Sequence, residues 1–262
     1  MSYFLTRLFK GKILWITLFM MLIISFIQYI FTFITTKGFN STHSIVISPY
    51  LSNILYFNRF PFYSELYLIV LPIAAAVTFS GMYRMDRNNG FLYSVLIKMG
   101  TQRYFLSLYS INFIISFLII AIPLLFNFYL YLMTYPAVAP NPIINYTSAT
   151  ISPTAQFHTV YYGHPNIYFL MYVFLNGMYG AICSSLALAV SFFIKRVYFV
   201  YVVPFILHIF WLTIGQSFIN PKEYLIKDLG FFELQNFLIV LIIIWILSLC
   251  VYVWGSKKHV LL

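Results

Sequence analysis

Side chains able to carry out acid–base, nucleophilic or metal chemistry are sparse in this sequence. Its 262 residues include 5 acids, 5 histidines and 2 cysteines. Cys183 and Cys250 lie in apolar stretches, so a disulfide is not expected, and two thiols are too few ligands for a metal site. His208 also interrupts an apolar stretch. We interpret it as a neutral imidazole bonded to a neighbouring helix, because no acid lies in any apolar stretch to pair with it.

The sequence signatures of several enzyme classes are absent. There is no GxxxxGK[ST] phosphate loop, no HExxH zinc helix and no GxSxG elbow. We therefore expect no catalytic residue, no metal, no directly bound cofactor and no ATPase site belonging to the chain itself. The apolar stretches also lack the central charged residues that ion-coupled carriers usually keep.

The composition is that of an integral membrane protein. The chain is 62% hydrophobic and 8% charged, whereas soluble domains carry about 25% charged residues. The net charge of +10 comes from basic residues in short loops between apolar stretches. This is the distribution of a membrane protein with basic cytoplasmic loops, not of a nucleic-acid-binding surface, so no nucleic-acid partner is expected.

Six apolar stretches predict an all-α membrane fold that forms a single transmembrane domain over residues 1–262. The expected spans are at about residues 13–34, 66–83, 104–133, 167–194, 197–219 and 234–254. The first is too long for a signal-peptide core and no small-x-small cleavage site follows it, so we expect a retained span. The third exceeds a ~30 Å hydrocarbon core and must tilt, kink at Pro123 or project beyond it.

The N-terminal segment predicts a short helix lying in the membrane interface. Leu5, Leu8 and Phe9 fall on one helical face, with Arg7 and Lys10 around it. A plain basic flank before the first span is the alternative.

The basic residues assign both termini to the cytosol. With the N-terminus inside, one acid and eleven of the fifteen basic residues are cytoplasmic, and this bias sets the orientation. The cytoplasmic basic set is Arg7, Lys10, Lys12, Arg84, Arg87, Lys98, Arg103, Lys195, Arg196, Lys257 and Lys258. The polar stretches 37–64 and 134–166 are then external loops.

Residues 84–103 form the longest polar interruption on the predicted cytoplasmic side. Asp86 and Arg87 can pair with a partner surface or with each other, and Gly90 permits a sharp exit from the second span. A short helix follows, with an apolar face suited to a groove on a partner. That predicted face consists of Phe91, Leu92, Val95 and Leu96. Lys98 and Arg103 can contact anionic head groups.

This segment resembles the one between the second and third spans of ABC transporter permeases of the type-2 exporter class, in particular the small six-span peptide- or drug-exporter or immunity kind. Asp86-Arg87-Asn88-Asn89-Gly90 resembles the acidic–basic–x–x–Gly run of that family, and Gly100-Thr101-Gln102-Arg103 resembles the start of its third span. The sequence departs from the family pattern at Asp86, where Glu is usual, and at Met99-Gly100, where Pro is usual. It also has Ser110 where Lys is common.

The resemblance implies that residues 84–103 are the coupling helix that docks into a cytosolic ABC ATPase. The implied coupling residues are Asp86, Arg87, Gly90, Phe91, Leu92, Val95, Leu96 and Arg103. ATP and Mg²⁺ would be bound by that separate ATPase, and a second permease copy or a homologous permease would complete the transporter. The implied location is the plasma membrane.

Small residues recur along the fourth predicted span. They are Gly177, Gly180, Ala181, Ser184 and Ser185. Gly177, Ala181 and Ser185 are four residues apart, and small residues at that spacing let helices approach closely. Packing within the chain is the preferred interpretation over a dimer seam.

The expected function is ATP-driven export of an amphipathic or hydrophobic solute, such as a peptide. The predicted spans offer a cargo only sparse neutral polar groups, and the chain has 29 Phe and 23 Tyr. The neutral groups are Gln28, Asn112, Asn127, Asn176, His208 and Gln216. The alternative is a non-transport scaffold, immunity or sensor protein that binds a partner through its loops.

Overall fold

The computed structural model describes residues 2–37, 48–56, 61–140, 157–214, 220–226 and 234–260. Within these residues the regular structure is helical and contains no strand. The helices are α1 (Ser2–Lys10), α2 (Lys12–Lys37), α3 (Pro49–Ser52), α4 (Pro61–Phe79), α5 (Met82–Asn88), α6 (Phe91–Met99), α7 (Thr101–Thr134), α8 (His158–Gly163), α9 (Pro165–Val190), α10 (Val197–Ile214), α11 (Pro221–Leu225) and α12 (Leu234–Val260).

Five of these helices, α2, α4, α7, α9 and α12, are long and apolar enough to cross a membrane. The chain is therefore a multi-pass membrane protein with an all-helical fold, as its composition predicts. The fifth predicted span corresponds to α10, whose 18 residues extend about 27 Å at the helical rise. Residues 215–219 of that predicted span lie outside the described part of the chain.

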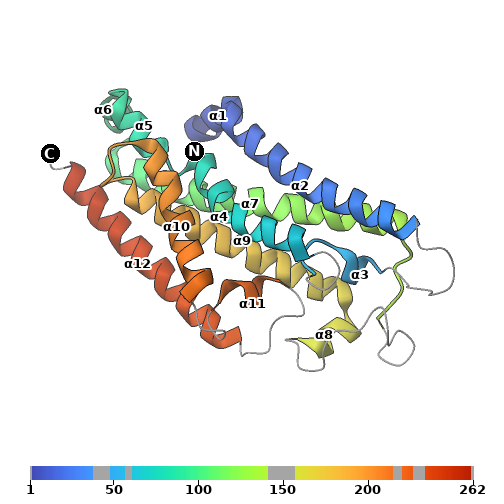
Figure 1. Cartoon of the computed structure of the whole chain (residues 1–262). Coiled ribbons are helices and arrows are strands. Elements are labelled where there is room, and N and C mark those ends of the chain that lie inside the picture. The colour runs from blue at the N-terminus through green and yellow to red at the C-terminus, as the bar shows by residue number, and fades with distance from the viewer. Residues whose placement is uncertain are drawn as a thin grey trace.

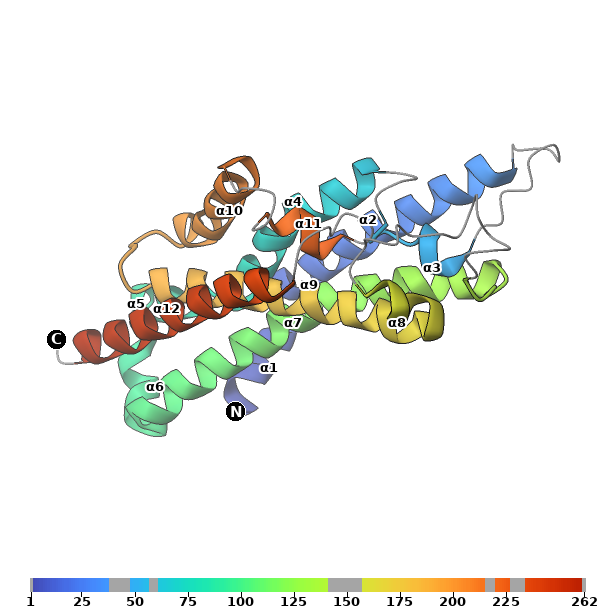
Figure 2. The same ribbon diagram turned by 90° about the horizontal axis from the view of Figure 1, so that it is seen from below.

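Helix α9 is the centre of the bundle. It packs against α4, α7, α10 and α12, and 78% of its most apolar window is buried, compared with 22% for α2 and for α12. The outer helices therefore present apolar side chains to the surroundings, as helices in contact with lipid do. Figures 1 and 2 show the helices running lengthwise, with α1, α5, α6 and both marked termini at one end and α3 and α8 at the other.

The second span ends earlier than predicted. Residues 66–83 were expected to be continuous, but α4 stops at Phe79 and α5 begins at Met82. The ring of Tyr201 from α10 lies against Gly81, and a Cβ at that position would overlap it. The close approach of α10 at a glycine thus accompanies the break between the two helices.

The third span is one uninterrupted helix. Helix α7 runs over 34 residues through Pro123, about 51 Å at the helical rise. The Tyr67 hydroxyl of α4 donates a 2.7 Å hydrogen bond to the carbonyl of Ile120, three residues before this proline. Because α7 is longer than a ~30 Å hydrocarbon core, it is long enough to reach beyond the apolar layer toward α6.

Helix α1 packs against the bundle through side chains that overlap only in part with the predicted apolar face. Phe4 and Leu8 are buried, whereas Phe9 is exposed, and the side chain of Leu5 lies outside the described set. The ring of Phe4 packs 5.3 Å from that of Tyr104 on α7. A stripe at i and i+4 therefore attaches α1 to the bundle.

Part of the polar segment 220–233, which joins α10 to α12, reaches into the bundle. The Asn176 side-chain amide, near the middle of α9, donates a 2.9 Å hydrogen bond to the carbonyl of Leu225 at the end of α11. Helix α11 therefore lies beside the interior of the apolar bundle. Residues 227–233, together with residues 38–47, 57–60 and 141–156 of the two longer predicted loops, are outside the described chain.

Candidate functional site

Two glycines shape the segment that the sequence singles out. Gly90 has φ +73° between α5 and α6, and Gly100 has φ +79° between α6 and α7. Residues with a Cβ rarely adopt this backbone conformation. The two turns place α6 at the end of the bundle, where it projects beyond α4 (Figure 1).

Asp86 is a buried anchor of α5 and not a surface contact. Its carboxylate is completely buried and forms an ion pair with Arg7 of α1. The hydroxyl of Tyr104, at the start of α7, donates a 2.9 Å hydrogen bond to the other carboxylate oxygen. The expectation that Asp86 pairs with a partner surface or with Arg87 is therefore wrong, because Asp86 joins α5 to α1 and α7 instead.

Arg84 and Asn88 tie α5 to the turn before α10. The Arg84 Nε donates a 2.8 Å hydrogen bond to the carbonyl of Lys195, and the Asn88 amide lies 3.5 Å from the same oxygen. Burial lowers the pKa of the Arg84 guanidinium, with a further contribution from nearby Arg87. The hydrogen bond to a backbone carbonyl compensates part of the cost of burying this cation.

Arg87 contacts Tyr83, an aromatic residue of the same helix. It is half-buried, and its guanidinium donates a 3.3 Å hydrogen bond to the Tyr83 hydroxyl. The ring of Tyr83 in turn packs 4.3 Å from that of Phe192. Burial raises the pKa of Tyr83, and the neighbouring Arg87 acts in the opposite direction. Arg87 therefore supports, from within α5, the tyrosine whose ring attaches this helix to Phe192.

Helix α6 has an exposed face that differs from the predicted one. Leu92 and Val95 are buried against the protein and Leu96 is half-buried, because the bundle itself covers that side of the helix. Phe91 is the member of the predicted face that is exposed, at 59%. The face open to a partner consists of Phe91, Tyr93, Ser94, Ile97 and Lys98, which we call the α6 face.

The α6 face has a basic edge. Its member Lys98 and the nearby Arg103 are exposed and line one shallow depression with Met99, Leu106 and Ser107. Ile97, beside Lys98, is 85% exposed. The combination is an apolar surface with a basic rim.

The small residues of α9 face other helices of the same chain. A Cβ at Gly177 would lie 2.6 Å from the Phe117 ring, and one at Gly180 would lie 2.7 Å from Ile120. Both neighbours belong to α7. Ser184 donates a 2.8 Å hydrogen bond to Asn112 of α7. Ala181 and Ser185 are also buried, and the Ser185 hydroxyl donates to the Ala181 carbonyl.

The fit at Gly180 leads to a stability prediction. Gly180→Val should destabilise the protein by about 1–3 kcal/mol, the usual cost of overpacking, because its side chain would collide with Ile120 and approach Ala75. Leu170→Val, at an exposed position of the same helix, is the control and should change little. Thermal unfolding of the detergent-purified protein measures both, and equal melting temperatures for the two variants would contradict this packing.

The neutral polar groups expected to meet a cargo are bonded within the chain. Asn127 donates to Gln28 and to the carbonyl of Ser25 on α2, at 2.9 and 2.8 Å. Asn112 and Asn176 bind Ser184 and Leu225, as described above. These bonds join helices of the same chain. Gln216 lies outside the described residues.

His208 bonds to a neighbouring helix, as its isolation in the sequence predicts. Its Nδ1 lies 2.5 Å from the Tyr179 hydroxyl of α9, and both groups are buried. The pair borders a cavity of about 260 Å³ that is also lined by Cys183, Trp211 and Ile244. With one imidazole and one thiol beside largely apolar walls, this cavity does not present a catalytic constellation.

Comparison with known proteins found no matching protein-family model, no matching curated protein and no matching solved structure. The functional assignment therefore depends on the residues and contacts of the chain itself.

Sequence reasoning located the segment but missed the residues that hold it. Arg7 and Tyr104 were not expected beside Asp86, since the Arg7–Asp86 pair joins residues 79 positions apart. Arg84 was counted only as a cytoplasmic charge. The one available signal was that Asp86 is the single acid among eleven basic residues at this end, which favours its pairing within the chain.

Proposed function

We propose that the chain is the transmembrane permease subunit of an ATP-driven ABC exporter. The observation that carries this proposal is the α6 face. Phe91, Tyr93 and Ile97 are 59%, 63% and 85% exposed, and they lie at the charged end of the bundle, outside the five apolar spans. Large apolar side chains exposed at the charged end of a bundle are typical of a site that a partner protein covers.

The partner is a cytosolic ABC ATPase subunit that binds ATP and Mg²⁺. The α6 face fits a protein groove because its aromatic and aliphatic side chains can enter an apolar pocket while Lys98 pairs with acids at the rim. The helix that precedes α6 is firmly attached, since Asp86 and Arg84 join α5 to α1, α7 and the α9–α10 turn. These attachments favour transmission of force from the ATPase through α6 and α5 to the bundle. The chain itself performs no ATP hydrolysis.

The proposed topology has six spans, with α10 as the additional crossing, in the plasma membrane. The eleven basic residues assigned to the cytosol belong to α1, the start of α2, α5, α6, the start of α7, the turn before α10 and the end of α12. Figures 1 and 2 place these parts at the end that carries both termini. Their common position supports a cytoplasmic assignment of that end by the charge rule.

A second copy or a homologous permease completes the transporter in this proposal. The cargo is amphipathic or hydrophobic, such as a peptide. Support comes from the exposed apolar faces of α2 and α10, where Phe19, Ile34 and Phe210 are among the most exposed side chains. These faces can contact lipid, another permease or an apolar cargo without charged contacts.

Site-specific photocrosslinking from α6 tests the proposal. A photoreactive amino acid at Ile97 should crosslink, in native membranes, to a protein of the ABC ATPase class with a phosphate-binding loop. Met133 is the control, because it is 65% exposed at the opposite end of α7, and it should give no such product. Crosslinks from Ile97 only to lipid or to a protein without an ATPase site would overturn the proposal and favour the scaffold alternative.

A further inference from the structure

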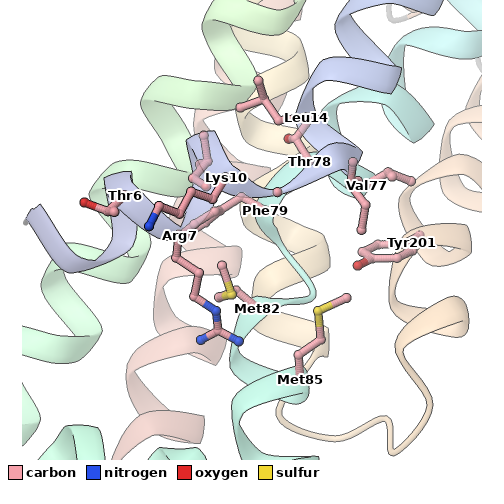
Figure 3. A pocket seen from close by; sticks show the side chains of 13 residues that line it. Thr6, Arg7, Lys10, Leu14, Val77, Thr78, Phe79, Met82, Met85 and Tyr201 are labelled. Carbon is pink, nitrogen blue, oxygen red and sulfur yellow. The ribbon is translucent and has the colours of Figure 1, made fainter.

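A pocket of about 710 Å³ lies between α1, the junction of α4 and α5, and α10. Figure 3 shows Arg7 and Lys10 of α1 on one side, Met82 and Met85 of α5 below, and Tyr201 of α10 on the other side. Its size is within the range of small-molecule sites, about 300–1,000 Å³. None of these residues belongs to the α6 face.

The pocket lies beside the start of an apolar helix, where a membrane interface is expected. Its wall includes the passage from α1 to α2, with Lys10 and Gly11 before Lys12, and Ile13 and Leu14 after it. The charged residues of α1 end there and the long apolar helix begins. A molecule in the pocket can therefore have its polar part beside Lys10 and its apolar part along α2.

The lining combines positive charge with apolar walls. Arg7 and Lys10 are both present, and no acid is among the lining residues. Arg7 is already paired with the buried Asp86, whereas Lys10 is exposed, so the ammonium of Lys10 is the more accessible cation. Hydroxyl groups come from Thr6, Thr78 and Tyr201. This set is complementary to a phosphate group that carries apolar chains.

The walls of the pocket are held in place by the chain. Leu8 and Leu14 are buried on the α1–α2 side, and the Tyr201 ring lies so close to Gly81 that a Cβ there would overlap it. The distance between α10 and the α4–α5 junction is therefore set by direct contact. A pocket formed in this way needs little reorganisation to bind a ligand, which favours affinity.

We propose that this pocket binds an anionic phospholipid from the adjacent leaflet, with its phosphate beside Lys10 and its acyl chains along Leu14, Val77 and the exposed side of α2. Charge complementarity selects the anionic lipid over a zwitterionic one. The lipid would occupy the space between the first and fifth predicted spans. This inference does not depend on an ATPase partner, so it can hold or fail independently of the transport function.

Native mass spectrometry of the detergent-purified full chain provides the test. Phosphatidylglycerol and phosphatidylethanolamine with the same acyl chains are titrated separately, and the first binding step is compared. We expect phosphatidylglycerol to bind more tightly. Lys10→Gln should weaken its first binding step about fivefold, the effect of removing one lysine near an anionic lipid. Val77→Trp, which fills the pocket with a large ring, should reduce the same step at least as much.

Lys257→Gln is the matched control. Lys257 is an exposed lysine near the end of α12, at the same end of the bundle but outside the pocket, so this variant should bind phosphatidylglycerol like the wild type. Melting temperatures verify that all three variants are folded, and Lys10→Met gives a second variant if Lys10→Gln is unstable. Equal binding of the two lipids, wild-type binding by both pocket variants, or an equal loss in Lys257→Gln would overturn the proposal.

Discussion

Replacing Asp86 with alanine should destabilise the protein more than any other single substitution considered for this end of the bundle. The carboxylate is completely buried and receives contacts from Arg7 and Tyr104. Removing it takes this carboxylate acceptor away from the buried Tyr104 hydroxyl and from the Arg7 guanidinium. Breaking a buried pair in this way costs about 3–5 kcal/mol, with the lower part of that range expected here because Arg7 is 32% exposed.

Thermal unfolding of the detergent-purified protein measures this effect. A loss of about 3 kcal/mol corresponds to a fall in melting temperature of roughly 6–12 °C. The control is Glu65→Ala, which breaks the ion pair between Glu65 and Lys222, whose side chains are 42% and 32% exposed. A surface pair of that kind contributes at most about 1 kcal/mol. Similar melting temperatures for Asp86→Ala and Glu65→Ala would show that Asp86 does not anchor α5.

A double variant separates the role of the pair from the role of packing. Arg7→Met combined with Asp86→Leu replaces both charges by apolar groups, and buried ion pairs can often be replaced in this way without loss. We expect the double variant to melt closer to the wild type than Asp86→Ala does. A further decrease would mean that Arg7 stabilises the fold through contacts other than the pair.

If the α6 face docks an ATPase as proposed, introducing a charge there should abolish assembly with that partner while leaving the chain folded. Ile97 is 85% exposed, so Ile97→Asp has little effect on the isolated chain. In a complex the aspartate would be buried in an apolar groove without a partner. Loss of a central interface anchor costs 2 kcal/mol or more, a decrease in affinity of at least about 30-fold.

The measurement is the amount of ATPase retained by the purified permease, together with ATP hydrolysis in reconstituted vesicles. Met133→Asp places the same charge at an exposed apolar site on the opposite end of α7 and should leave both quantities unchanged. Ile97→Val, a conservative change, should retain most of the binding. Full ATPase binding by a well-folded Ile97→Asp protein would exclude the α6 face as the docking surface.

The sequence predicted the helical elements well because each depends on local information. Long apolar stretches predict the ends of α2, α7 and α9 to within four residues and the start of α12, which continues to Val260, six residues past the predicted end. The small side chains of α9 predict close packing because small residues four positions apart lie on one helix face and allow a neighbouring helix to approach. The turn at Gly90 was visible for a similar reason, since a glycine between a charged run and an apolar run favours a sharp change in direction.

Contacts between distant residues were not predictable in the same way. The partner of Asp86 is 79 positions away, and the carbonyl that receives Arg84 is 111 positions away. The exposed side of α6 was assigned incorrectly for the same reason: Leu92 and Ile97 are both apolar, and only the packing of the bundle determines which of them is covered. The break after Phe79 likewise lies beside a residue distant in the sequence, Tyr201 of α10.

The two anchors of α5 limit how this helix can move. Arg84 and Asp86 are two residues apart, which places them about 200° apart around a helix axis, so they hold α5 from nearly opposite sides. Rotation of α5 about its own axis would pull one anchor away from its acceptor. A displacement of α5 that preserves both contacts must therefore carry the N-terminal helix and the entrance of α10 with it.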